Sequence, residues 1–272
     1  SKSLTSSIAS VKGEALKDVP GNSVDGMLQG RAAGVMISTG GSNVGEAPVI
    51  NIRGVASITS STTPLYVVDG MPINTNNISS ATDFNPIADI NPADIKSIDI
   101  LKDAAATAMY GSRAAAGVVL ITTKNGQTGG KAKLTYDYAF NLNVPTEFTK
   151  TMNAEQYVEI KTLGRINSGY ETQDGTHMYN LMKDSKGNII DTNWTDLLFQ
   201  TGNAHNHNLN VSGGNDKAQY YVGLGYQKQQ GIAVHDDYER FSFKGNTNIK
   251  FNKWMKIGLN TSYTNSKVNV VD

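Results

Sequence analysis

The chain has 272 residues, its 24 basic and 24 acidic side chains cancel, and it contains no cysteine. The basic residues are scattered singly, which argues against a nucleic-acid-binding surface, and the lack of cysteine excludes thiol catalysis, thiolate metal sites and disulfides. No apolar run approaches the ~20 residues of a membrane-spanning helix. Transmembrane β-strands remain compatible with this composition, because lipid-facing and lumen-facing residues alternate in them.

The first half of the chain has the composition of a compact mixed α/β domain. Gly, Pro, Asn and Ser interrupt short apolar runs every 8 to 15 residues or so, roughly as in strands and short helices joined by turns. The predicted strands are 7–13, 34–40, 48–55, 64–70, 97–101 and 117–124. The predicted helices are 22–31 and 103–111. The second of these begins at Asp103, whose charge favours a helix N-terminus, and ends at Gly111, a common helix stop.

After about Gly130 the chain changes to long strands in which apolar and polar residues alternate. The predicted strands are 132–144, 219–227, 240–251 and 255–263, with one more that carries His205 and His207. In the first of them the apolar residues occupy the even positions: Ala132, Leu134, Tyr136, Tyr138, Phe140, Leu142 and Val144. The strands reach the ~9 to 11 residues that cross a bilayer, and their turns are short at one end and long at the other. These features favour an outer-membrane β-barrel over a soluble sandwich.

Five such strands cannot close a barrel. An open sheet in lipid would leave backbone donors and acceptors unpaired along both edges, at a cost of several kcal/mol for each group. The alternation therefore predicts either that this chain is the N-terminal part of a longer protein or that the strands do not lie in a membrane.

No stretch carries a recognisable catalytic or cofactor site. The loop 111–113 lacks phosphate-loop spacing and follows a helix, so no helix N-terminus points at an anion there. His205 and His207 share a strand face without a third metal ligand at a suitable spacing, and we interpret them as an exposed pair. Acidic and amide residues between 83 and 99 fit no EF-hand and are interpreted as turn and helix caps. The chain is predicted not to be an enzyme and to use no cofactor or metal.

Four stretches of the first half stand in the order found in the plug domain of SusC/RagA-type TonB-dependent outer-membrane transporters, and the chain resembles this family. The stretches are 23–37, 50–55 with its Arg-Gly pair, 64–73 with its Asp-Gly turn, and 91–126. The resemblance continues through 152–157, 211–232, 238–251 and 254–260, and so covers nearly the whole chain.

The resemblance implies an α+β plug domain, a small mixed sheet with short helices, followed by antiparallel strands of an incomplete transmembrane β-barrel. We assign the plug to residues 1–127 and the first barrel strands to residues 128–272, with a long loop at 145–204. The strands would be about five of the ~22 in a plugged transporter barrel.

The resemblance also implies a function, the TonB-dependent import of a nutrient across the bacterial outer membrane, with the plug gating the barrel lumen. The expected cargo is an oligosaccharide or a peptide. The expected partners are outer-membrane lipid, a SusD-like surface lipoprotein and the TonB complex, reached through an N-terminal segment that this chain lacks before Ser1. The alternative is a soluble or surface-exposed β-rich module for glycan binding or adhesion.

The resemblance further singles out ten plug-motif residues with structural or gating roles. They are Arg53, Gly54, Asp69, Gly70, Lys102, Asp103, Tyr110, Gly111, Arg113 and Gly117. The glycines are expected to permit turns or close backbone approach. Arg53 and Arg113 are expected to pair with carboxylates on the barrel wall, because a charge there needs a partner or water. The alternative interpretation is that Arg53 and Arg113 are ordinary arginines exposed to solvent.

Overall fold

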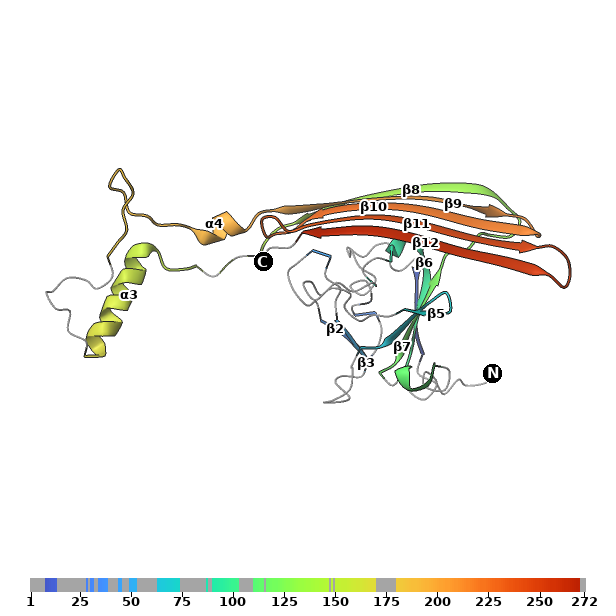
Figure 1. The fold of residues 1–272 in the computed structure, drawn as a ribbon, viewed down its shortest axis with the longest axis horizontal. Helices are drawn as coiled ribbons and strands as arrows, with labels where there is room; N and C mark the ends of the chain where they lie inside the picture. Colours follow the sequence, from blue (N-terminus) through green and yellow to red (C-terminus); the bar gives the residue numbers. More distant parts are fainter. Residues whose placement is uncertain are drawn as a thin grey trace. The chain divides into compact units, whose positions relative to one another are not determined.

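A computed structural model shows an N-terminal domain, a sheet of long strands and a smaller helical segment (Figure 1). The described residues are 8–13, 28, 30–31, 34–38, 44–45, 49–52, 63–73, 87, 90–102, 110–114, 116–146, 148, 150–169 and 180–269. The chain forms two compact units, Ser1–Asn143 together with Gly202–Asp272, and Val144–Thr201. The N-terminal domain and the long strands belong to the first unit.

A mixed sheet of five strands forms the N-terminal domain. In the order in which they pair, its strands are β1 (Ile8–Lys12), β6 (Ile95–Leu101), β7 (Val118–Thr123), β4 (Leu65–Val68) and β5 (Met71–Ile73). The β4 and β7 strands run parallel, and the other neighbours run antiparallel. A separate antiparallel pair consists of β2 (Val35–Ser38) and β3 (Val49–Ile52). The predicted α+β class, with a small mixed sheet, is confirmed.

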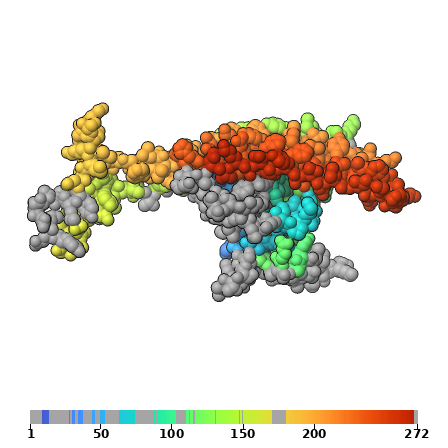
Figure 2. All heavy atoms as spheres, in the orientation of Figure 1, coloured from blue at the N-terminus to red at the C-terminus, as the bar shows by residue number. Residues whose placement is uncertain are grey.

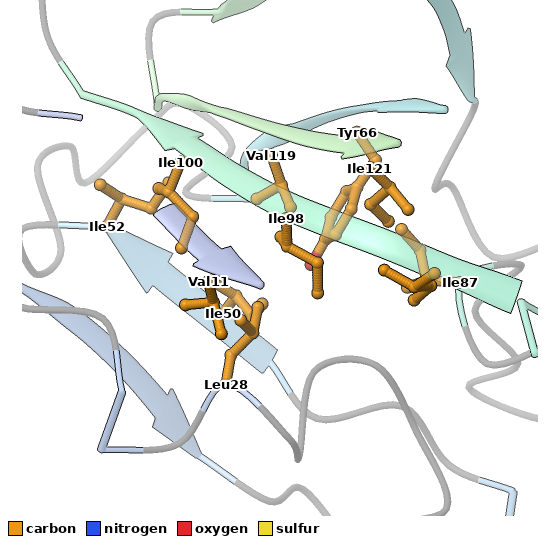
Figure 3. Close-up of a cluster of buried hydrophobic side chains, with 11 residues drawn as sticks. Val11, Leu28, Ile50, Ile52, Tyr66, Ile87, Ile98, Ile100, Val119 and Ile121 are labelled. Atoms are coloured by element: carbon orange, nitrogen blue, oxygen red, sulfur yellow. The ribbon is translucent and has the colours of Figure 1, made fainter. Parts of the chain in front are cut away.

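Alternate residues of β6 and β7 form the centre of the hydrophobic core. Ile98, Ile100, Val119 and Ile121 are at most 1% exposed, and they lie together in Figure 3, near Ile50 of β3. Burying one such side chain contributes about 1.5–3 kcal/mol. The N-terminal domain is therefore held together by its own apolar core.

A two-residue turn joins β4 to β5, because Val68 pairs with Met71. Asp69 and Gly70 both have positive φ, 48° and 86°. This is the pattern of a type I′ hairpin turn, for which Asp-Gly is a preferred sequence. The β5 strand was not predicted, because Pro72 disfavours a strand except at a sheet edge, which is where β5 lies.

The two helices predicted in this domain fall largely outside the described residues. At the C-terminal end of the second predicted helix, 103–111, the structure has a short 3-10 helix, η4 (Gly111–Ala114). A second one, η3 (Pro92–Asp94), leads into β6. The Asn91 side chain accepts a hydrogen bond from the backbone N–H of Ala93 at 3.0 Å, so Asn91 caps η3 as predicted.

The second sheet consists of five strands of 13 or 14 residues. They are β8 (Gly130–Asn143), β9 (Gly202–Gly214), β10 (Ala218–Gln230), β11 (Asp237–Lys250) and β12 (Lys256–Asn269). Each pairs antiparallel with the next, so the strands lie side by side from green to red in Figure 1. Because β8 and β12 each have one neighbour, the sheet is open, as predicted.

The long-stranded sheet has an apolar face and a polar face, which follow from the period of two along each strand. We call the side that carries Tyr226 and Phe241 the apolar face and the side that carries Lys244 and Asn246 the polar face. Large side chains of the apolar face are exposed, among them Leu134, Tyr136, Tyr138, Phe140, Leu142, Leu224, Tyr226, Phe241, Leu259 and Tyr263. Figure 2 shows strands β9 to β12 of this sheet as one continuous orange and red band.

The segment Val144–Thr201 forms the second unit and contains two α-helices, α3 (Ala154–Asn167) and α4 (Trp194–Leu198). A reciprocal capping box starts α3, in which Asn153 accepts from the Gln156 N–H at 2.8 Å and Gln156 accepts from the Asn153 N–H at 3.2 Å. Within the described ranges, neither these helices nor any other combines the length and the apolar character needed to cross a membrane.

Replacing Ile98 by alanine should loosen the N-terminal domain. The side chain is 0% exposed, and such truncations cost about 2–5 kcal/mol. In the full-length protein we expect faster tryptic cleavage within residues 1–127. Met71→Ala is the matched control, because Met71 is 67% exposed in the same sheet. Equal cleavage of both variants would contradict this assignment of the core.

Candidate functional site

The polar face of β11 is the surface on which the N-terminal domain is seated. From Tyr238 to Asn246, every second residue of this strand is buried: Tyr238, Arg240, Ser242, Lys244 and Asn246. Arg240 Nη1 donates to the Ile90 carbonyl at 3.5 Å, and Lys244 Nζ donates to Asp69 at 2.9 Å. One strand therefore contacts separate segments of the N-terminal domain through alternate side chains.

Asp69 connects the N-terminal domain to β11 by contacts with both Thr123 and Lys244. Its left-handed turn directs the carboxylate to Lys244, to the Thr123 N–H at 2.9 Å and to the Thr123 hydroxyl at 2.7 Å. Burial disfavours the charged form, but the hydrogen bonds from Thr123 and Lys244 outweigh it and hold the pKa of Asp69 below its ordinary value. The carboxylate is therefore ionised at neutral pH and paired with a lysine of the long-stranded sheet.

The turn that η3 forms makes a second contact, with β9 and β10. Asn91 Nδ2 donates to Asn208 at 2.9 Å, and the Tyr221 hydroxyl lies 2.6 Å from Asp94 Oδ1 and 2.9 Å from Asn210 Oδ1. Burial raises the pKa of Asp94 above its ordinary value, against the hydrogen bond from Tyr221. A raised pKa means that the stability this carboxyl contributes is complete at low pH and is lost as pH rises through the raised value.

Two glycines of β10 allow this turn to approach the sheet. A Cβ atom at Gly223 would lie 2.2 Å from Asp94 Oδ1, and one at Gly225 would lie 2.3 Å from Asn91 Nδ2. Both distances are far below van der Waals contact, so a side chain at either position would force the Asp94 or Asn91 side chain away from its hydrogen-bond partners. The glycines lie two residues apart and therefore face the same way, toward the N-terminal domain.

Contacts also occur toward both ends of β11. Asn246 Nδ2 donates to Thr123 Oγ1 at 3.0 Å and to the Lys124 carbonyl at 2.6 Å. At the other end, Asp236 precedes the strand and accepts from the Val44 N–H at 3.1 Å. Burial raises the pKa of Asp236, although the hydrogen bond from Val44 opposes this.

Among the described residues, the contacts across this interface include several hydrogen bonds and the Asp69–Lys244 ion pair, in contrast to the apolar core of the N-terminal domain. Each such hydrogen bond contributes only about 0.5–1.5 kcal/mol net, because water replaces it when the partners separate. Within the described ranges, no group of three or more His, Asp or Glu residues could hold a metal ion. The arrangement is suited to holding and releasing a domain.

Comparisons with known proteins agree with this architecture. Residues 1–118 match the family model "TonB-dependent Receptor Plug Domain". TonB-dependent receptor P26 of Formosa agariphila is 33% identical over 96% of this chain, and TonB-dependent receptor SusC of Bacteroides thetaiotaomicron is 30% identical over 99%. A solved structure of the RagAB peptide importer in a closed-closed state matches 99% of this chain with a TM-score of 0.83 and 25% identity.

The chain belongs to the SusC/RagA-type TonB-dependent receptors. It spans 25% of the length of each of the two curated relatives and 32% of the matched importer chain. The N-terminal domain is the plug, and the long-stranded sheet is a part of the barrel. From here on we call that sheet the wall. TonB-dependent receptors are outer-membrane transport proteins, and the apolar face of the wall matches this setting.

The structure places seven of the ten predicted plug-motif residues. Three glycines have positive φ, as a left-handed turn requires: Gly70, Gly111 and Gly117. Asp69 contacts the wall, Lys102 is buried, and Tyr110 packs on the cluster that contains Val118. Arg53, Gly54 and Asp103 lie outside the described residues.

Arg113 lies in η4, and its side chain is exposed. Between plug and wall, the ion pair that the structure shows has the opposite polarity to the one expected, with the carboxylate of Asp69 on the plug and the ammonium of Lys244 on the wall. Pairing of Arg53 and Arg113 with wall carboxylates stays a prediction.

Sequence reasoning missed the wall side of the interface. The alternation predicted for 240–251 separates a polar face from an apolar face, yet it does not show which wall residues meet which plug residues. Gly223 and Gly225, separated by Leu224, were the available signal. Glycine in a strand interior often marks a place that another group approaches closely, here the side chains of Asp94 and Asn91.

His205 and His207 lie on the apolar face of β9, beside β8. The Nδ1 atom of His205 lies 2.9 Å from the Tyr138 hydroxyl, and that of His207 lies 2.8 Å from the Tyr136 hydroxyl. The pair is therefore part of an aromatic cluster on the wall.

Gly223→Ala should displace the plug turn from the wall. Leaving buried partners such as Asp94 unsatisfied costs about 1–3 kcal/mol, which corresponds to roughly 5- to 150-fold faster amide hydrogen exchange in residues 90–95 of the full-length receptor. Gly245→Ala is the matched control, because a Cβ there would meet only Phe243, at 3.4 Å. Unchanged exchange in Gly223→Ala would refute the close-approach argument.

The Asp69–Lys244 contact should respond to acid with a defined sign. The lowered pKa of Asp69 means that the contact stabilises the seated plug above the ordinary carboxyl pKa of about 3.9 and is lost as pH falls through the lowered value. Limited pepsin digestion of the full-length receptor between pH 5 and pH 2 measures this loss. Asp69→Asn should be cleaved faster already at pH 5 and change less with pH.

Asp99→Asn is the control for this titration, since Asp99 lies on the plug strand β6 and its side chain hydrogen-bonds Ser97 of the same strand. It should follow the wild-type pH dependence. Parallel curves for wild type and Asp69→Asn would show that another group governs the acid response.

Proposed function

We propose that the protein containing this chain imports a nutrient across the bacterial outer membrane, and that displacement of the plug from the wall opens the path. The division into a plug at residues 1–127 and wall strands at residues 128–272, with the segment 145–204 between the first two strands, is part of this proposal. The import would be driven by the TonB complex.

The observation that carries the proposal is the polar plug–wall interface. An apolar interface would expose surface to water when it opens, at about 25 cal/mol for each Å². Here the described wall side chains that hydrogen-bond to the plug are polar, as Lys244, Asn246 and Tyr221 illustrate, and water can replace their partners. The plug keeps its own apolar core, so it can leave the wall as a folded unit.

The apolar face of the wall supports the membrane location. Leu134, Tyr136 and Leu259 are between 60% and 68% exposed on it. Soluble proteins rarely expose a continuous apolar patch larger than a few hundred Å². A soluble binding module, the alternative from the sequence, would need a partner to cover this face, whereas lipid covers it in a barrel.

The cargo and partners follow from the relatives. The matched importer is named for peptides, and SusC stands among the curated relatives. We therefore propose an oligosaccharide or peptide as cargo and a SusD-like surface lipoprotein as partner. The plug motifs Arg53-Gly54 and Lys102-Asp103, together with Tyr110, Gly111, Arg113 and Gly117, are proposed as structural and gating residues. No catalytic step is required of any residue in this scheme.

A disulfide between plug and wall tests whether the plug must move. A Cβ atom at Gly223 would lie 3.2 Å from Asp94 Cγ, so Asp94→Cys with Gly223→Cys brings two thiols together and removes the side chain that a Cβ at position 223 would meet. In the full-length receptor, oxidation should reduce uptake to the level seen without energised TonB. Reduction should restore it.

The measurement uses a nutrient whose uptake is lost when the receptor gene is deleted. Asp94→Cys alone, under the same oxidant, is the control and should keep its uptake after oxidation. This chain has no native cysteine that could form competing disulfides. Equal uptake in the oxidised and reduced double variant would contradict gating by plug displacement.

A further inference from the structure

Three lysines form a row on the polar face of the wall, at the end where the turns are short. Lys250 of β11 pairs directly with Lys256 of β12. The backbone N–H of Lys250 also donates to the carbonyl of Lys217, in the turn before β10, at 2.7 Å. Residues directly opposite on neighbouring strands share a face, and their Cβ atoms lie about 4.5–5.5 Å apart. We call these residues the lysine row.

The lysine row lies on the same face as the plug contacts. Lys250 is an even-numbered residue of β11, like Lys244 and Asn246, and the period of two places all three on one side. That side is the lumen face of the barrel, so the row lies at the mouth of the lumen and faces away from lipid.

A cavity of about 230 Å³ occurs at this row. Its polar lining comes from Lys217, Lys250, Lys256, Asp216, Gln219 and Asn248. In the part of the chain that the structure describes, none of the three lysines forms an ion pair, and Asp216 is the one carboxylate in the lining. Positive charge therefore remains uncompensated at a cavity large enough for a small ligand group.

Like charges directly opposite on neighbouring strands destabilise the pair. The repulsion between Lys250 and Lys256 is relieved when an anion lies between them, since each ammonium offers donors that a carboxylate accepts. Gln219 and Asn248 supply further amide donors on the same face. The cavity thus combines charge and hydrogen-bond donors for a carboxylate.

We propose that the lysine row is an anion-binding site at the short-turn mouth of the lumen and that it takes a carboxylate group of the transported molecule. This rests on the proposed function, because the short turns of outer-membrane barrels are periplasmic, so imported cargo that passes the plug leaves through this mouth. The site gives the transporter a preference for acidic cargo, such as a chain of uronic acids, over a neutral molecule of the same length.

Lipid phosphate is the other source of an anion near this end of the strands, because Phe251 and Trp254 are 63% and 82% exposed there. Aromatic residues of this kind mark the membrane interface. The lysine row, however, shares the lumen face with the plug contacts. The geometry therefore favours cargo over lipid, and the experiment separates the two.

Lysine footprinting of the full-length receptor in non-ionic detergent tests the site. Acetylation is followed residue by residue by mass spectrometry, with trigalacturonate as the acidic probe and maltotriose as its neutral counterpart. At about twice its Kd the acidic probe occupies two-thirds of the sites, so acetylation of the lysine row should slow about threefold. Maltotriose should have no effect.

Lys228 and Lys267 serve as internal controls, because they lie on the apolar face of β10 and β12 and should be acetylated at the same rate with either probe. Lys250→Glu, which places a carboxylate opposite Lys256, should abolish protection of Lys256 by trigalacturonate. Protection that persists in this variant would overturn the site.

Two further outcomes would also overturn the proposal. The first is equal acetylation of the lysine row with and without trigalacturonate. The second is protection by phosphatidylglycerol micelles but not by trigalacturonate, which would assign the site to lipid. Nutrient uptake is measured separately. A receptor that imports a nutrient but shows no footprint would contradict only the anion-binding site. Equal uptake in the oxidised and reduced disulfide variant would contradict the proposed function itself.

Discussion

The contact between plug and wall depends on two glycines of β10, which have no side chains that would obstruct it. Gly223 and Gly225 leave room for the turn that carries Asn91 and Asp94. The hydroxyl of the nearby Tyr221 donates a hydrogen bond to the Asp94 carboxyl. The side chains of Asn91 and Asp94 occupy the space that these glycines leave, and the polar side chains of β11 bridge the same two surfaces.

Different interactions stabilise the interior of the plug and its contact with the wall. Inside the plug, Ile98 and Ile121 belong to an apolar core whose burial is worth far more than any single hydrogen bond. Between plug and wall, the contacts are polar, and the Asp69–Lys244 ion pair is the best defined of them. A domain held in this way can change its position without losing its fold.

The two plug carboxyls that face the wall respond to protons in opposite directions. The pKa of Asp69 is lowered, so its contribution is lost in acid, whereas the pKa of Asp94 is raised by burial, so its contribution is lost as pH rises. Their surroundings explain the difference. A lysine and two hydrogen bonds from Thr123 stabilise the charge on Asp69, but the Asp94 carboxyl lies where burial outweighs the hydrogen bond from Tyr221.

The sequence by itself determined whatever depends on local pattern. Alternation with a period of two placed the long strands and both of their faces, and Asp-Gly at 69–70 indicated its turn, because these features arise from backbone geometry and neighbouring residues. The edge strand β5 was not predicted, because Pro72 disfavours a strand anywhere but at a sheet edge. Only the tertiary structure decided that Lys244 meets Asp69 and that Gly223 meets Asp94. These partners stand 175 and 129 positions apart in the chain, and no local pattern specifies which surfaces fold against each other.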